Sequence, residues 1–139
     1  MKVVVFDLGG TLMEYVRMPD SWVDYYTQGF EAINEKYCLG VSESDIIKSV
    51  EVLKGYNPRV NYREDEYSPE YIFSKVLEHW ENNVPVTDCI NTFFEGLNLK
   101  AIIYPDTISA LEKLKSIGYQ IATLTDLPTA MPDEISKKN

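Results

Sequence analysis

The chain has 139 residues, with 22 acidic and 13 basic side chains, a formal net charge of −9 and 45% hydrophobic residues. This balance leaves no basic stripe for nucleic acid or an anionic membrane surface, and the apolar content suffices for a buried core. The N-terminal apolar run is broken by Asp7, which argues against a signal peptide, and no stretch is long enough to span a bilayer. Two widely separated cysteines favour reduced, buried thiols. We therefore expect a cytoplasmic protein with one domain, or one small domain with an insertion.

The first expected strand covers residues 1–6 and ends at Asp7, which is followed by Gly9, Gly10 and Thr11. A short strand that is apolar throughout predicts cover on both of its faces, as in a parallel sheet. An acid at its carboxyl end lies where open α/β sheets place their ligands, and the two glycines allow a sharp turn close to a bound group. The residues alone fit equally well a plain glycine turn with Asp7 as a cap. We expect residues 7–15 to form a site loop.

Residues 16–99 are expected to form a helical unit of about four helices. Apolar side chains recur at helical spacing in each of them, for example at Trp22, Tyr26, Phe30, Ile33 and Tyr37. Ser42, Ser68 before Pro69, and Thr87 after Pro85 are the expected N-caps. Gly40 is the expected stop after the first helix.

The pattern changes after residue 100. Residues 101–106 are an apolar connector into a helix that carries Ile108, Leu111 and Leu114 and ends at Gly118. Residues 119–126 predict a second strand ending in Thr125 and Asp126, and the helix with this strand forms half of a βαβ crossover. The remaining residues are expected to be loop or the start of a helix.

The segment from Phe6 to Leu12 resembles motif I of the haloacid dehalogenase-like (HAD) hydrolase superfamily, a hydrophobic strand followed by Asp-x-Asp-x-Thr. Asp7 and Thr11 match the first Asp and the Thr of that motif. An all-helical cap inserted after motif I, and a strand ending in Thr or Ser as motif II, match residues 16–99 and Thr125 with Asp126. The resemblance therefore runs through nearly the whole chain.

The resemblance implies an α/β fold. A partial Rossmann-like core with parallel strands would comprise residues 1–15 and 100–139, and residues 16–99 would be the cap. It also implies a Mg²⁺-dependent phosphatase that acts on a small phosphorylated compound through an aspartyl-phosphate. Asp7 would be the nucleophile and a metal ligand, Gly9 would offer its carbonyl to the metal, and Thr125 would hold the phosphoryl group. The implied phosphate-binding residues are Gly9, Gly10, Thr11, Thr125 and Asp126.

Two departures from the family pattern limit this interpretation. Gly9 replaces the second Asp, which in family phosphatases protonates the leaving group, a step worth about 10²–10⁴-fold in rate. Three interpretations remain: the leaving group needs no acid, Glu14 or a cap residue takes the place of the missing Asp, or the protein is a weak or inactive phosphatase. Members of the family without this Asp also cleave C–P or C–halogen bonds. The basic residue of motif III and the acids of motif IV are not assigned in this chain.

We therefore expect this chain to be a truncated and inactive form of the hydrolase. It would be the N-terminal part of a longer protein, or one that completes its sheet with a second chain, as in a dimer. The alternative is a non-catalytic HAD-like protein or fragment with a binding or assembly role. Residues 57–67, with Arg59, Tyr62, Arg63 and Tyr67, are interpreted as a charged surface loop in preference to a substrate-binding cap loop.

Overall fold

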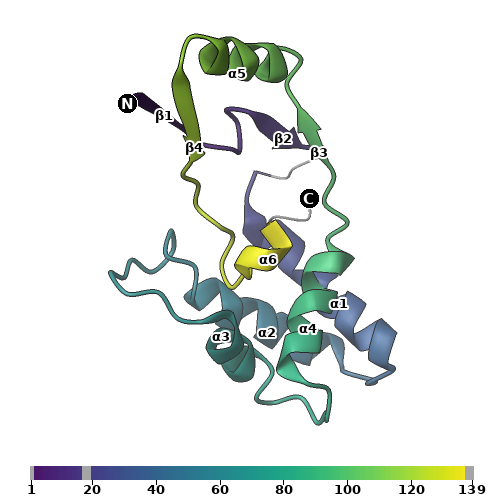
Figure 1. The fold of residues 1–139 in the computed structure, drawn as a ribbon. Coiled ribbons are helices and arrows are strands. Elements are labelled where there is room, and N and C mark those ends of the chain that lie inside the picture. The colour runs from purple at the N-terminus through teal and green to yellow at the C-terminus, as the bar shows by residue number, and fades with distance from the viewer. Residues whose placement is uncertain (1, 17–19, 137–139) are drawn as a thin grey trace. The chain divides into compact units, whose positions relative to one another are not determined.

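The computed structural model describes residues 2–16 and 20–136, which form a mixed α/β protein (Figure 1). Three of the segments expected from the sequence include residues that lie outside the described ones. They are Met1 in the first strand, residues 17–19 at the start of the helical insertion, and residues 137–139 at the end of the core. The chain divides into two compact units. We call Met1–Met18 with Leu99–Asp126 the strand unit, and Pro19–Asn98 with Leu127–Asn139 the helical unit. None of the described helices is long and apolar enough to cross a membrane.

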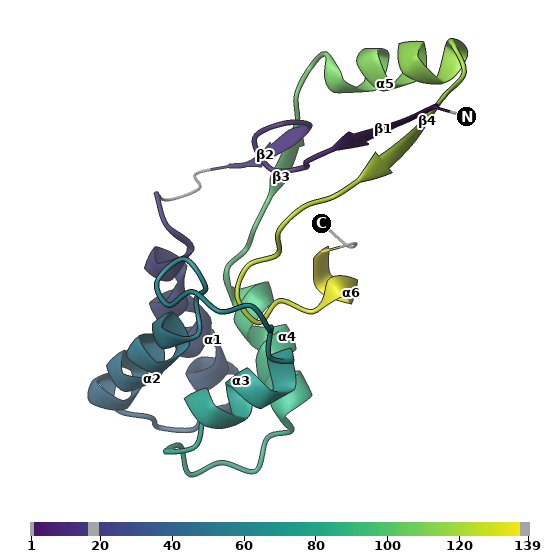
Figure 2. The ribbon, with the colours of Figure 1, turned by 90° about the vertical axis from the view of Figure 1, so that its left-hand side faces the viewer.

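A two-stranded parallel sheet forms the strand unit together with one helix. β1 (Lys2–Phe6) pairs with β4 (Tyr119–Thr123), from Lys2 opposite Tyr119 to Phe6 opposite Thr123. Figures 1 and 2 both show the two strands side by side. α5 (Thr107–Ser116) precedes β4 and packs against it, and Gly118 follows with φ +88°. The expected parallel strands are therefore confirmed, and β4 stops three residues short of its expected end.

A second, antiparallel pair of strands was not expected from the sequence. β2 (Met13–Tyr15) lies in the expected site loop, and β3 (Ala101–Ile103) lies in the expected connector. Met13 pairs with Ile103 and Tyr15 with Ala101. Strands of three residues are too short to show the alternation from which a strand is predicted. β3 pairs with β2 and is not part of the β1–β4 sheet.

The expectation that both faces of the first strand are covered is wrong for the described structure. Val3 and Val5 of β1 are 50% and 56% exposed, and Leu124 after β4 is 76% exposed. No apolar side chain described in the strand unit is buried. The physical reason is that a sheet of two strands with one adjacent helix presents too little surface to cover an apolar strand on both sides.

The helical unit holds a short 3-10 helix (Trp22–Tyr25), α1 (Tyr26–Tyr37), α2 (Glu43–Gly55), α3 (Pro69–Val76), α4 (Val86–Gly96) and α6 (Asp133–Ser136). Ser42 and Ser68 accept hydrogen bonds from the backbone N–H groups of Asp45 and Tyr71, both at 3.2 Å, so these two predicted caps are confirmed. Thr87 lies inside α4, whose N-cap is Pro85, so the third predicted cap is wrong. α1 ends before Gly40, because Cys38 already adopts a left-handed conformation with φ 52°.

Aromatic side chains form the centre of the helical unit. Phe30, Phe73 and Phe93 are at most 1% exposed, with ring centroids 4.9 Å apart for Phe30 and Phe93 and 5.3 Å for Phe73 and Phe93. α1 and α4 approach closely, since a Cβ on Gly29 would lie 2.4 Å from the Phe93 ring. The first and last helices of the insertion are thus packed directly together.

One buried hydroxyl links three segments of this core. Ser49 is fully buried on α2, accepts a hydrogen bond from Trp80 Nε1 at 2.9 Å and donates to the Val76 carbonyl at 3.2 Å. His79 Nε2 lies 3.3 Å from the same hydroxyl and 3.0 Å from the Asp45 carbonyl. Because each polar group has a partner, burial of this serine costs little.

Residues after the second strand belong to the helical unit, whereas the sequence placed them with the strands. Ala130 and Met131 are 7% and 5% exposed. Burial raises the pKa of Tyr26, and its hydrogen bonds oppose this shift. The cysteines also differ from expectation in one respect: both are free, but only Cys89 is buried and Cys38 is exposed.

Candidate active site

The carboxyl ends of β1 and β4 lie at the same edge of the parallel sheet. Phe6 is opposite Thr123, and the Leu124 N–H donates to the Phe6 carbonyl at 2.9 Å. Asp7 is the next residue after β1, and Thr125 and Asp126 follow β4 within three residues. Neighbouring strands are about 4.8 Å apart, so this register brings the two segments next to each other. Asp7 and Asp126 are exposed, and Thr125 is half-buried.

The loop after Asp7 is held compactly by its own backbone. The Leu8 carbonyl accepts hydrogen bonds from the N–H groups of Thr11, Leu12 and Met13, at 2.9–3.2 Å, and the Gly10 N–H donates to the Met13 carbonyl at 2.8 Å. Gly10 has φ +77°, a conformation that favours glycine. The N–H groups of Gly10 and Thr11 are used inside the loop, so of the donors on these two residues only the Thr11 hydroxyl is left for a phosphate.

Other backbone donors at this edge have no partner in the described part of the chain. They are the N–H groups of Leu8, Gly9 and Asp126. The Thr125 hydroxyl makes only a 3.5 Å contact with the Asp126 carbonyl. Free N–H groups next to a hydroxyl are the donors that a phosphate oxygen requires. The structure thus leaves a set of donors beside Asp7.

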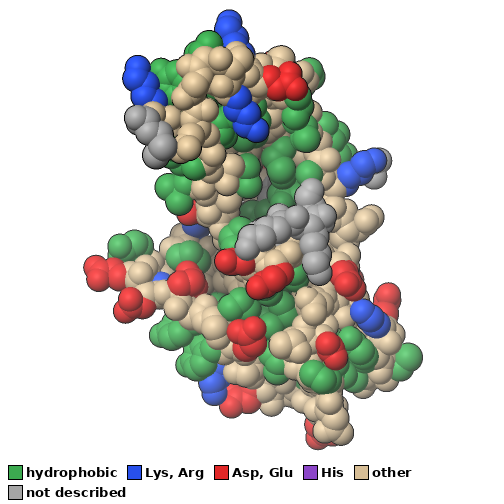
Figure 3. Space-filling view, in the orientation of Figure 1, with side chains coloured by type: hydrophobic (Ala, Val, Ile, Leu, Met, Phe, Trp, Pro, Cys, Tyr) green, Lys and Arg blue, Asp and Glu red, His purple; other side chains and the backbone are tan. Residues whose placement is uncertain are grey.

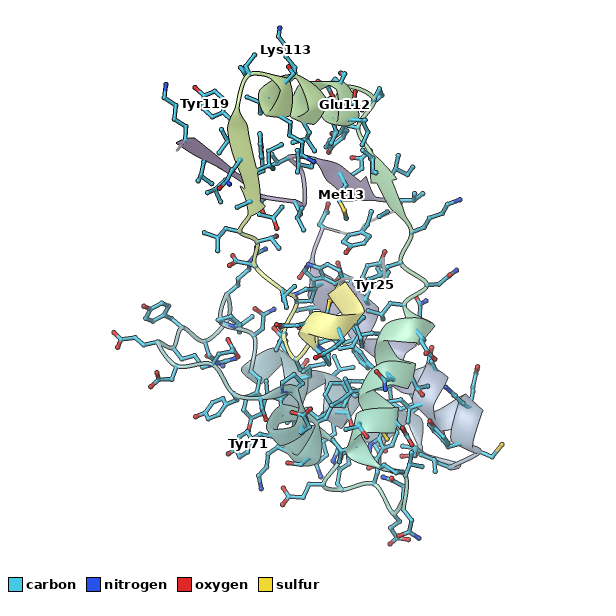
Figure 4. All side chains as sticks on the ribbon, in the orientation of Figure 1. Met13, Tyr25, Tyr71, Glu112, Lys113 and Tyr119 are labelled. Carbon is cyan, nitrogen blue, oxygen red and sulfur yellow. The ribbon has the colours of Figure 1, made fainter. Side chains whose placement is uncertain are left out.

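Glu14, one of the expected substitutes for the missing acid, is engaged elsewhere. Its carboxylate accepts a hydrogen bond from the Tyr104 hydroxyl at 3.2 Å. Partial burial and the Glu14 charge both raise the pKa of Tyr104. Thr107, the one buried residue described in the strand unit, donates to the Leu12 carbonyl at 2.8 Å. The end of the site loop is thereby held in two ways. Met13 (Figure 4) pairs with β3, and the start of α5 binds the Leu12 carbonyl.

The oxygens expected to hold Mg²⁺ are uncommitted. Among the described residues, the Asp7 carboxylate and the Gly9 carbonyl have no hydrogen-bond or ionic partner. No group of three or more His, Cys, Asp or Glu side chains in this part of the chain forms a metal site. Mg²⁺ binds through one or two carboxylates and keeps several waters, so one carboxylate and one carbonyl fit it by donor type.

The negative charge of the protein resides in the helical unit. The strand unit has five acidic and five basic residues, against 17 and eight in the helical unit. Acidic side chains accordingly gather over the helical unit on the face drawn in Figure 3. The strand unit is electrically balanced, so its own net charge does not oppose an anion at the sheet edge.

The arginine considered for a cap loop is held within the helical unit. The Arg63 guanidinium donates to the Tyr56 carbonyl and to Glu66, and it lies 5.4 Å from the centre of the Tyr67 ring. Its contacts organise residues 56–67 locally, which favours a structural role over recognition of an anion.

Sequence reasoning missed Tyr104, Thr107 and the strands that carry or adjoin them. The apolar run Ala101–Ile103 was the available signal, and only its antiparallel partner at β2 identifies it as a strand. No family model matches this chain, and no curated protein matches it significantly.

Proposed function

We propose that the chain carries the nucleophile and phosphate-binding part of a HAD-like, Mg²⁺-dependent phosphatase that acts on a small phosphorylated compound. The observation that carries the proposal is the parallel register of β1 and β4, with Asp7 and the Thr125–Asp126 segment at one sheet edge. The strand unit corresponds to a partial Rossmann-like core, and the Pro19–Asn98 part of the helical unit corresponds to a cap inserted between β2 and β3. Open α/β sheets bind ligands at this edge.

In this proposal the Asp7 carboxylate attacks the phosphorus atom while the bond from phosphorus to the leaving group breaks, and the bonding pair departs with that group. The aspartyl-phosphate is then hydrolysed by water, which breaks the P–O bond to Asp7 and releases inorganic phosphate. The Thr125 hydroxyl and the free N–H groups of Leu8, Gly9 and Asp126 bind the phosphoryl oxygens. The Asp7 carboxylate and the Gly9 carbonyl would hold Mg²⁺. When bound, this ion supplies positive charge that lets one anion approach another.

The test is phosphate release from 4-nitrophenyl phosphate by the natural gene product and by the 139-residue chain, with and without Mg²⁺. Asp7→Asn is the matched variant, because it keeps the size of the side chain and removes the nucleophile. We expect Mg²⁺-dependent phosphate release that Asp7→Asn abolishes. Peptide mass mapping of the protein without this substitution should find phosphate trapped on Asp7. No Asp7-dependent release from either protein would refute the proposal.

A second candidate function is a non-catalytic binding or assembly role, in which another chain completes the sheet. The observation that favours it is the exposure of Val3 and Val5, about half of each side chain, on the β1 strand. Exposed apolar strands of this kind tend to pair with further chains. A change of oligomeric state on Val5→Lys, measured by light scattering, would support this role.

A further inference from the structure

Gly9 and Gly10 are adjacent in the site loop, but only Gly10 needs to be glycine. Gly10 has φ +77°, where a side chain is strained. Gly9 lies outside the left-handed region, and a Cβ built on it would have no atom within 4 Å. A side chain therefore fits at position 9, and neither the backbone nor packing explains the glycine there.

The loop next to Asp7 also lacks a proton donor. Residues 8–12 are Leu, Gly, Gly, Thr and Leu, none of which titrates near neutral pH. Glu14, the next acid along the chain, is hydrogen-bonded to the Tyr104 hydroxyl. Asp126 is the remaining acid described at the sheet edge, so it must enter the test. Residues 8–12 therefore contain no acid that could protonate a leaving group.

Resting on the proposed function, we propose that the site acts preferentially on phosphoryl compounds whose leaving group departs as a stable anion, acyl phosphates above all. An Asp7 oxygen forms a bond to phosphorus while the P–O bond to the acyl group breaks. The bonding pair leaves with the carboxylate, and no proton is transferred. Water then attacks the phosphorus, the P–O bond to Asp7 breaks, and the water proton passes to solvent. The products are the free carboxylate, inorganic phosphate and one proton.

The acidity of the leaving group decides which substrates need help. A carboxyl has a pKa of about 4 and a phenol one of about 10, and alcohols are weaker acids still. A carboxylate therefore leaves unaided at neutral pH, whereas a phenolate or alkoxide gains about 10²–10⁴-fold from a positioned acid. An open glycine at position 9 suits the first class and not the second.

The experiment compares acetyl phosphate, 4-nitrophenyl phosphate and phenyl phosphate as substrates of the natural gene product with Mg²⁺, after subtraction of the Asp7→Asn rates. We expect phenyl phosphate to be slower than acetyl phosphate by at least about 10²-fold. Gly9→Asp should narrow this ratio by about tenfold or more, since it supplies a proton donor. Gly9→Asn, nearly equal in size but unable to donate a proton in this way, should keep the wild-type ratio.

The outcomes distinguish failure of this inference from failure of the proposed function. Asp7-dependent turnover with similar rates for all three substrates overturns the inference and leaves the proposed function standing. The inference is also overturned if the ratio of the acetyl phosphate rate to the phenyl phosphate rate widens in Asp126→Asn. The same holds if this ratio narrows equally in Gly9→Asn and Gly9→Asp. Absence of Asp7-dependent turnover of every substrate overturns both. If Gly9→Asp does not fold, the dependence of the wild-type rate on leaving-group pKa over a series of substituted phenyl phosphates decides the question.

Discussion

Replacement of Gly29 by alanine is expected to destabilise the helical unit, although alanine is the better helix former. The new Cβ would lie 2.4 Å from two ring carbons of Phe93, more than 1 Å inside a normal carbon contact of about 3.5–4.0 Å. Phe93 is 1% exposed and is enclosed by the rings of Phe30, Phe73 and Phe94, so it cannot swing aside. One of the two helices must shift.

The magnitude follows from two opposing contributions. Overpacking of a buried site costs about 1–3 kcal/mol, whereas the change from glycine to alanine inside a helix contributes about 1 kcal/mol of stability. We therefore expect Gly29→Ala to lower the free energy of unfolding by up to about 2 kcal/mol. Gly55→Ala is the matched control, because it lies at the end of α2 with the nearest atom 3.9 Å from its Cβ position. That variant should be neutral or more stable by up to about 1 kcal/mol.

Urea unfolding followed by tryptophan fluorescence measures both variants. Trp22 and Trp80 both belong to the helical unit, so the signal reports this unit. The midpoint should fall for Gly29→Ala and not for Gly55→Ala, with an unchanged dependence on urea. The double variant Gly29→Ala/Phe93→Leu should lose less free energy of unfolding than the sum of the losses in the two single variants. Equal midpoints for the two alanine variants, or strict additivity with Phe93→Leu, would refute the packing argument.

Four further predictions concern the burial or exposure of single side chains. Ser49→Ala should lower the free energy of unfolding by about 1–3 kcal/mol in urea titrations, because it leaves the buried Trp80 indole N–H without its acceptor, and an unchanged midpoint would contradict this. Burial raises the pKa of the Cys89 thiol to about 11, so iodoacetamide at pH 8 should label Cys38 alone in the folded chain, and both thiols in denaturant, by peptide mass mapping. Since the Cys89 pKa is raised on folding from an ordinary 9.0, stability should also fall as the pH rises from 9 towards 11. Val5→Thr should change the free energy of unfolding by less than about 0.5 kcal/mol, because Val5 is 56% exposed, and a larger loss in thermal melts would show that something covers it.

Features set by local chemistry could be predicted from the sequence. Ser42 and Ser68 were identified as caps because a hydroxyl that accepts from an N–H three residues later acts within a single turn. The parallel placement of β1 and β4 also followed from the sequence, since a helix, a glycine and an apolar run suggest a crossover. The segments after these strands were therefore expected at one edge.

Features that depend on distant partners could not be predicted. β2 and β3 have three residues each and become strands only by pairing across a long insertion. Val3 lies in a run with the composition of a buried strand, and yet it is half exposed. Composition does not reveal whether other parts of the chain cover the strand. The engagement of Glu14 by Tyr104 also depends on this strand pairing, so the role of Glu14 stayed open until the pairing was known.

The pairing of Tyr15 with Ala101 closes a loop of 85 residues, and this has a consequence for the order of folding. Closing such a loop in a disordered chain costs about 4 kcal/mol of entropy, for a gain of only three residue pairs. Because α1 packs on α4 within the helical unit, prior folding of that unit leaves a much shorter loop to be closed, and the entropy cost falls accordingly. The helices should therefore form first, which brings β2 and β3 close enough to pair. Pulsed hydrogen exchange during refolding would then protect the amides of α1 and α4 before those of β2 and β3, and the reverse order would disprove this sequence of events.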